Sequence, residues 1–307
     1  MSISSYIKEI GRGKRGARDL SREQAADLMA QLLDGQISAL EIGAFCIAMR
    51  VKGESPEELA GFLDAVQPRL ALVSTGGAPT VVIPAYNGAR KLPALVPLLA
   101  LLLAREGVAV LVHGSLSEVN ADARVTSESV LRELGIDPLA QPGPVAAGQV
   151  AYAPTAVLSP ALDALLQVRR TLALRNSAHS LVKLMNPVQG PALILTSYTH
   201  REYIEPMGHT LRLVGHAGLI LRGTEGEPVA DPRRTPRMDA VIGQDLLCVD
   251  EGETGSLAKL DELPTDVSAA STARYTRAVL AGELPLPEPI ARQLRHVLAL
   301  LPRLAQS

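Results

Sequence analysis

The hydrophobic periodicity of the chain changes near residue 70, and this change constrains the fold more than any other feature. From Leu20 to about Val66 the apolar residues recur at helical spacing. Short runs rich in β-branched residues follow, separated by helix-like or loop segments: 80–83, 108–112, 150–152, 193–195, 218–221 and 246–249. Strands that alternate with helices favour a largely parallel sheet covered on both faces. We therefore predict an α/β protein with a helical domain at 1–72, against which the helical stretch 162–187 packs, and an α/β domain at 73–307.

Capping residues mark the starts of three helices within the helical domain. At each start a serine stands three residues before a glutamine or glutamate, so that the two side chains can cap the first turn. The pairs are Ser21 with Gln24, Ser38 with Glu41, and Ser55 with Glu58. Asp34-Gly35 is typical of a helix end, and Pro56 suits the first position of the third helix.

The composition is that of a globular protein with a large core. Hydrophobic residues make up 47% of the 307 residues and charged residues 20%. The N-terminus is polar, and the longest apolar stretch, 92–104, contains two prolines and is too short to span a bilayer. We expect a cytoplasmic protein without membrane contact. Cys46 and Cys248 stand among apolar residues, which favours buried thiols over a disulfide or a zinc site.

Charge is unevenly distributed although the net charge is only −2. Basic residues crowd the first 22 positions, and acidic residues crowd a late segment, 250–262. A near-neutral total does not exclude a basic face. It does exclude the globally basic profile from which nucleic-acid binding is inferred on composition alone.

The segment Tyr86 to Lys91 joins an apolar strand-like run to an apolar helix-like run, where an α/β enzyme keeps a phosphate-binding loop. Such loops use several glycines to expose backbone N–H groups, whereas this one has only Gly88, followed by two cations. Arg90 and Lys91 are predicted to begin a helix on the side of a cleft. Because cations there oppose the helix dipole, their position favours a role in binding phosphate.

The helical segment Leu20 to Val66 resembles the N-terminal domain of anthranilate phosphoribosyltransferase, in its caps and in "GAF" and "KGESPEEL". His113-Gly114, "LGI" at 134–136, Arg175 and Asn186-Pro187 follow in the order of that family. The resemblance implies the phosphoribosyltransferase and nucleoside phosphorylase type of fold, with a mostly parallel central sheet. It also implies a homodimer formed through the helical domain and a site in the hinge cleft.

The catalytic motifs of that family are largely missing. Its GTGGD loop falls on 85–89, where only Gly88 is kept, and its KHGN motif falls on 112–115, where the lysine and asparagine are gone. Its magnesium-binding acidic pair falls on Pro228 and Val229, although Glu225 and Glu227 lie close by. Without such a pair, the pyrophosphate leaving group is poorly neutralised. Arg175 matches the family arginine that faces the aromatic acceptor.

These departures are shared by a second family. The stretches "PAYNGARKLPALVPLLALLL", "VHG", "RNSAHSLVKLMNP" and "GTEGEPVADPRR" resemble the YbiB family. That resemblance implies a homodimer that binds DNA or RNA, single- or double-stranded, with little sequence preference. It implies no transferase reaction, no catalytic residue, no metal and no cofactor. The alternative that stays open is a phosphoribosyl- or glycosyltransferase, a pentosyltransferase acting on a phosphoribosyl or nucleoside substrate.

Phosphate contact requires several cations on one surface, and stacking requires an exposed aromatic residue nearby. The candidates are Lys14, Arg15, Arg18, Tyr86, Asn87, Arg90, Lys91, Arg169, Arg170, Arg175 and Lys183. Each has an ordinary alternative: a solvated tail for the first three, a packing role for Tyr86, and surface charge for the helix arginines. A fourth cluster, Arg222 with Arg233, Arg234 and Arg237, is interpreted as surface charge, and His113 as structural. Aromatic residues make up only 3% of the chain, which favours backbone contacts over base reading.

Overall fold

The computed structural model describes residues 3–13, 15–115 and 124–306. Its N-terminal part is helical and consists of α1 (Ile3–Ile10), α2 (Arg22–Leu33), α3 (Ala39–Lys52) and α4 (Pro56–Val66). The three predicted helices are confirmed, and all three serines form capping boxes with the residues that the sequence indicated. Helix α1 was not predicted; its buried residues Ile3, Tyr6 and Ile10 tie the N-terminus to the core.

A seven-stranded sheet forms the centre of the molecule, in the order β3-β2-β1-β4-β5-β6-β7. The strands are β1 (Thr80–Pro84), β2 (Ala109–Gly114), β3 (Val150–Pro154), β4 (Leu193–Tyr198), β5 (Ala217–Arg222), β6 (Met238–Ile242) and β7 (Asp245–Asp250). Strands β1 to β5 are parallel, whereas β6 and β7 form an antiparallel extension. The predicted mostly parallel sheet is confirmed. Strand β6 was not predicted because its apolar run is short, is interrupted by Asp239 and follows Arg237.

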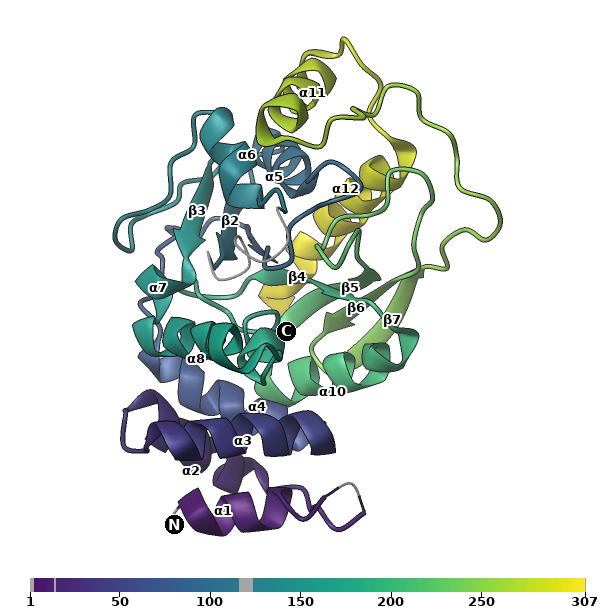
Figure 1. The fold of residues 1–307 in the computed structure, drawn as a ribbon. Coiled ribbons are helices and arrows are strands. Elements are labelled where there is room, and N and C mark those ends of the chain that lie inside the picture. Colours follow the sequence, from purple (N-terminus) through teal and green to yellow (C-terminus); the bar gives the residue numbers. More distant parts are fainter. Residues whose placement is uncertain (1–2, 14, 116–123, 307) are drawn as a thin grey trace.

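Alternate residues of the central strands face two separate cores. Val82 of β1 packs with the N-terminal helices, whereas Val81 and Ile83 face the opposite side of the sheet. Both faces are therefore buried, which explains the nearly continuous apolar runs of these strands. Figure 1 shows the N-terminal helices, α8 and α10 below the sheet, and α5, α6 and α11 above it.

The remaining helices connect the strands and cover the sheet. They are α5 (Val96–Arg105), α6 (Ser127–Glu133), α7 (Thr155–Leu158), α8 (Pro160–Leu172), α9 (Ala178–Leu181), α10 (Ile204–Val214), α11 (Ala269–Ala281) and α12 (Glu288–Leu300). Short 3₁₀ turns follow at Gln67–Arg69, Arg201–Tyr203 and Leu301–Gln306. The expected continuous helix from Leu162 to Leu184 is wrong: α8 ends at Leu172, where Ala173 adopts a left-handed conformation. Helix α8 packs in the same core as α2 and α4. The boundary at residue 72 stays a prediction.

Two further expectations concern the surface. No helix in the described part of the chain is both long and apolar enough to cross a membrane. Cys46 is buried as predicted, but Cys248 is exposed. The prediction fails for Cys248 because β7 is the edge strand of the sheet, and most of its side chains are exposed or only half-buried.

Candidate nucleic-acid interface

A cleft opens at the carboxyl ends of the parallel strands. It has a volume of about 780 Å³ and is lined by the segments that follow β1, β4 and β5, including Lys91, Tyr198 and Arg222. Strands β1 and β4 are neighbours in the sheet, and the chain leaves them toward opposite edges. Ligands of open α/β sheets bind in the crevice at such a switch point. The cleft is therefore where a ligand of this protein is expected.

The loop after β1 differs from its predicted form. Arg90 and Lys91 do not begin a helix, since α5 starts only at Val96. Both side chains are exposed, and Lys91 lies at the rim of the cleft. The loop is instead an irregular turn in which Gly88 adopts φ 66°, a conformation that favours glycine. The backbone N–H groups of residues 87, 88 and 90–92 therefore lack helical partners, whereas the N–H of Ala89 donates to the carbonyl of Val125.

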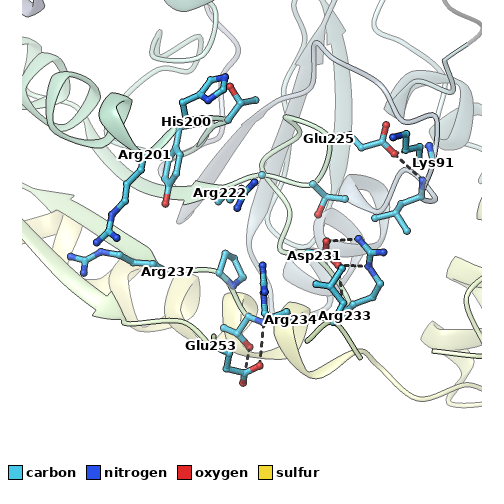
Figure 2. Close-up of a pocket in the computed structure, with 18 of the residues that line it drawn as sticks. Lys91, His200, Arg201, Arg222, Glu225, Asp231, Arg233, Arg234, Arg237 and Glu253 are labelled. Carbon is cyan, nitrogen blue, oxygen red and sulfur yellow. Dashed lines mark hydrogen bonds and ion pairs between the residues drawn. The ribbon is translucent and has the colours of Figure 1, made fainter. Parts of the chain in front are cut away.

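Two carboxylates of the chain itself accept hydrogen bonds from these N–H groups. Oε1 of Glu227 accepts hydrogen bonds from the backbone N–H groups of Asn87 and Gly88, the latter at 2.8 Å. The carboxylate of Glu225 accepts from the N–H groups of residues 90–92, at 2.7–3.0 Å (Figure 2 shows the bond to Lys91). The loop is thus an anion-binding turn, and its anions are internal.

Side-chain contacts lock the two loops together. Asn87 is 4% exposed; its amide donates to the carbonyl of Gly226, and its Oδ1 accepts from Nη2 of Arg175 at 2.7 Å. Nη1 of Arg124 donates to the Asn87 carbonyl at 3.3 Å. Gly226 has φ 90°, and a Cβ there would lie 2.4 Å from the Asn87 side chain. Asn87 and Arg175 thus hold the loop in place, and the role predicted for Asn87 at an interface is corrected.

Tyr86 also lies inside the protein rather than on the cleft surface. It is 5% exposed, and its hydroxyl lies 2.8 Å from Nδ1 of His113 and 2.7 Å from Oγ1 of Thr155. Burial raises the pKa of its phenol. Its assignment as a base-stacking residue is therefore corrected to the packing alternative.

His113 ends β2 in the middle of the core, where it is fully buried. Desolvation lowers its pKa from 6.5 to about 3, so the imidazole is neutral at physiological pH. Its burial within the sheet, with the Tyr86 ring packed against its own, agrees with the structural role inferred from the sequence.

The depressed pKa of His113 predicts a loss of stability in mild acid. The unfolded chain takes up a proton near pH 6.5 and the folded chain only near pH 3, so the contribution is present above pH 6.5 and is lost as the pH falls. Between pH 7 and pH 5 we expect His113 to account for about 2 kcal/mol of the fall in unfolding free energy. In urea unfolding, the unfolding free energy of His113→Gln should fall by about 2 kcal/mol less than that of wild type between pH 7 and pH 5. The variant His209→Gln, at an exposed histidine, serves as control. Parallel profiles for His113→Gln and wild type would contradict this.

The other predicted contact residues are spread over the molecule. Lys14 lies outside the described residues. Arg15 and Arg18 are exposed on the α1–α2 connection, which Figure 1 places at the far end of the helical part from the sheet. Arg169 and Arg170 belong to the last turn of α8. The half-buried Lys183 donates to the carbonyl of Ser197 at 3.5 Å. The structure therefore brings Arg90, Lys91 and Arg175 to one loop and leaves the N-terminal cations elsewhere.

The cations that do line the cleft come mainly from the cluster interpreted as surface charge. They are Lys91, Arg201, Arg222, Arg233, Arg234 and Arg237 (Figure 2). Arg233 is paired with Asp231, and Arg237 with Asp239 and Glu251. Arg201 and Arg222 are exposed and form no ion pair with any described carboxylate. The feature of the sequence that could have indicated this cluster is the set of three arginines among prolines at 232–237. Arg201 joins these arginines only through the fold.

The site does not fit the magnesium ion that the fold implies. Pro228 and Val229, which stand where the acidic pair is expected, are buried apolar residues. Glu225 and Glu227 direct carboxylate oxygens to backbone N–H groups, which repel a cation. In the described part of the chain, no cluster of three or more histidine, cysteine or acidic side chains is arranged to hold a metal. The predicted absence of metal and cofactor stays a prediction.

Comparison with known proteins agrees with the fold. Residues 4–68 match the helical bundle domain of the glycosyl transferase family. YbiB of Escherichia coli (strain K12), an uncharacterized protein, is 38% identical over 302 residues, which cover 96% of this chain and 92% of that protein. An anthranilate phosphoribosyltransferase of Methanopyrus kandleri is 27% identical over 314 residues, covering 93% and 85% of the two chains. The structure of the Thermus thermophilus anthranilate phosphoribosyltransferase has a TM-score of 0.73 at 23% identity, with 99% and 94% coverage.

The protein therefore has the anthranilate phosphoribosyltransferase type of fold, as predicted. Within the proteins that share this scaffold, the chain belongs to the family of YbiB.

Proposed function

We propose that this protein binds DNA or RNA with little sequence preference along its cationic cleft, and does not transfer phosphoribosyl groups. The observation that carries the proposal is the filling of the phosphate loop by Glu225 and Glu227 while cations on the same cleft stay exposed. The internal carboxylates compete with a pyrophosphate for the backbone N–H groups. The exposed side chains of Arg90 and Lys91, which project from the loop, still reach an external polyanion.

The charges that remain suit a polymer better than a magnesium complex. A phosphodiester chain carries one negative charge per phosphate, and isolated Lys and Arg side chains neutralise it through charge-assisted contacts. Lys91, Arg201 and Arg222 line the cleft, and Arg90 is exposed beside Lys91 in the chain. Among the tyrosines and phenylalanines in the described part of the chain, only Tyr203 is exposed, which supports backbone contact and low sequence specificity.

A salt series of binding tests this proposal. Fluorescence anisotropy with mixed-sequence DNA and RNA should give affinities that fall steeply with salt, because binding releases counterions. The double variant Arg90→Gln, Lys91→Gln should bind several-fold more weakly and reduce the salt slope by about 1 to 2. A double variant with the same charge change on α11 and α12, Arg274→Gln, Arg295→Gln, serves as control and should bind like wild type.

Two results would overturn the proposal. One is the absence of binding in the micromolar range at low salt. The other is magnesium-dependent release of pyrophosphate from phosphoribosyl pyrophosphate, which would support the alternative of an active pentosyltransferase.

We also propose that a second copy of the chain covers one face of α3. Leu40, Ala44, Ile47 and Val51 form an exposed stripe with helical spacing, and Leu40 is 83% exposed. Contiguous exposed apolar residues mark interaction sites. A homodimer formed here, as the family resemblance implies, would join two cationic clefts by symmetry. Sedimentation equilibrium distinguishes this dimer from a monomer of 32.4 kDa.

A further inference from the structure

Three arginines line the cleft together with Tyr198. Arg201 follows β4, Arg222 ends β5, and Arg237 immediately precedes β6; all three line the same cavity (Figure 2). Burial raises the pKa of the Tyr198 phenol and the nearby Asp239 raises it further, whereas all three guanidinium groups act in the opposite direction. The fold thus brings three cations from separate segments to one cavity.

Two of these three guanidinium groups lack a counter-charge among the described residues. Arg237 is neutralised by Asp239 and Glu251, but Arg201 and Arg222 face no described carboxylate within ion-pair distance. The acidic residues that line the cavity bind other groups: Asp231 pairs with Arg233, Glu251 with Arg237, Glu253 with Arg292, and the Glu225 carboxylate accepts from loop N–H groups. Arg234 donates only to the carbonyl of Gly255. Like charges held together repel, and an anion bound between them removes that cost.

An exposed aromatic pair stands at the rim of this cavity. His200 lines the cavity and lies 6.4 Å, between ring centroids, from Tyr203, which is 50% exposed. An exposed tyrosine offers a face on which a nucleobase can stack. The cavity volume of about 780 Å³ is within the range of small-molecule sites. Tyr203 does not line the cavity itself, but it offers a stacking surface beside His200 and two residues from Arg201, which both do.

We infer that this cavity binds a nucleoside phosphate monoester, with the phosphate between Arg201 and Arg222 and the base against Tyr203. A monoester carries nearly two negative charges near neutral pH, whereas an internal phosphodiester carries one. Two guanidinium groups that share one cavity and form no ion pair with a described carboxylate therefore favour the monoester, whereas Arg90 and Lys91 project from an exposed loop. The monoester is either a free mononucleotide or the phosphorylated end of a strand. Binding of a strand end rests on the proposed function, whereas binding of a free mononucleotide does not.

The test compares oligonucleotides that differ only at their ends. Single strands of about 12 nucleotides with a 5′-phosphate, a 3′-phosphate or no terminal phosphate are titrated into the full-length protein by fluorescence anisotropy. We expect one phosphorylated end to bind about tenfold more tightly than the unphosphorylated strand. Arg201→Gln, Arg222→Gln should abolish the difference, whereas Arg90→Gln, Lys91→Gln should weaken all strands equally. Nucleoside monophosphate should compete better than inorganic phosphate, and Tyr203→Leu should remove that advantage.

The outcomes separate the two proposals. If all strands bind equally and nucleoside monophosphate, titrated by calorimetry, does not bind, the inference is wrong while the proposed function stands. If no strand binds but nucleoside monophosphate does, the cavity is a mononucleotide site and the proposed function fails. If inorganic phosphate competes as well as the nucleotide, the assignment of a nucleoside is overturned.

Discussion

Replacing Glu58 by alanine is expected to lower the free energy of unfolding by about 4 kcal/mol. Glu58 is fully buried, and its carboxylate binds Nζ of Lys52 at 2.6 Å and the backbone N–H groups of Leu20 and Ser55. Burial lowers the pKa of Lys52, but the hydrogen bonds that its ammonium group donates to Asp19 and Glu58 outweigh this effect and raise it. Alanine would leave a nearly buried ammonium group with only the exposed Asp19 as counter-charge. Urea unfolding at neutral pH measures the loss.

Two variants separate the ion pair from the helix cap. Glu58→Gln keeps an oxygen acceptor for Leu20 and Ser55 but removes the charge, so an intermediate loss is expected. Glu57→Ala, one residue earlier in the same first turn but exposed, should change stability by less than about 0.5 kcal/mol. Equal losses in Glu58→Ala and Glu57→Ala would mean that the buried pair contributes nothing.

Local chemistry made most of the fold predictable. Ser21, Ser38 and Ser55 cap their helices within three residues, so the sequence contains the whole interaction. Apolar runs also indicated the strands, because each strand of the parallel sheet is buried on both faces. The missed features depend on distant contacts. Helix α1 is stabilised by packing against α3, and the break after α8 depends on the left-handed Ala173, which no residue type announces.

The site was predictable only in part, because its central contact joins segments about 140 residues apart. The sequence drew attention to the loop at 86–91 and placed Glu225 and Glu227 near the lost acidic pair. Nothing local could show that these carboxylates turn toward the loop. The same holds for Arg201, which lies in a short 3₁₀ turn and becomes part of a cationic cluster only through the order of β4 and β5.

Because the Glu227 carboxylate binds the loop, we expect Glu227→Ala to be less stable than wild type. We also expect pyrophosphate to restore part of the lost unfolding free energy. Without the carboxylate, the buried N–H groups of Asn87 and Gly88 lose a charged acceptor, which costs about 3 kcal/mol. A bound pyrophosphate can supply oxygen acceptors in the vacated volume. At ten times its dissociation constant it stabilises the folded state by about 1.4 kcal/mol. Thermal unfolding with and without pyrophosphate measures both effects.

The comparison that decides is how much more pyrophosphate stabilises Glu227→Ala than it stabilises the wild type. The wild type is needed as reference because the arginine cavity binds anions in both proteins. Glu227→Gln retains an acceptor for the loop, so it should lose less stability and gain no extra response. Asp250→Ala removes another buried carboxylate, which binds Arg292 and His296, and should be destabilised without an extra response to pyrophosphate. If Glu227→Ala responds like Asp250→Ala, the loop has lost the geometry of a phosphate site. An extra response confined to Glu227→Ala would mean that the loop still binds phosphate and that Glu227 keeps it closed.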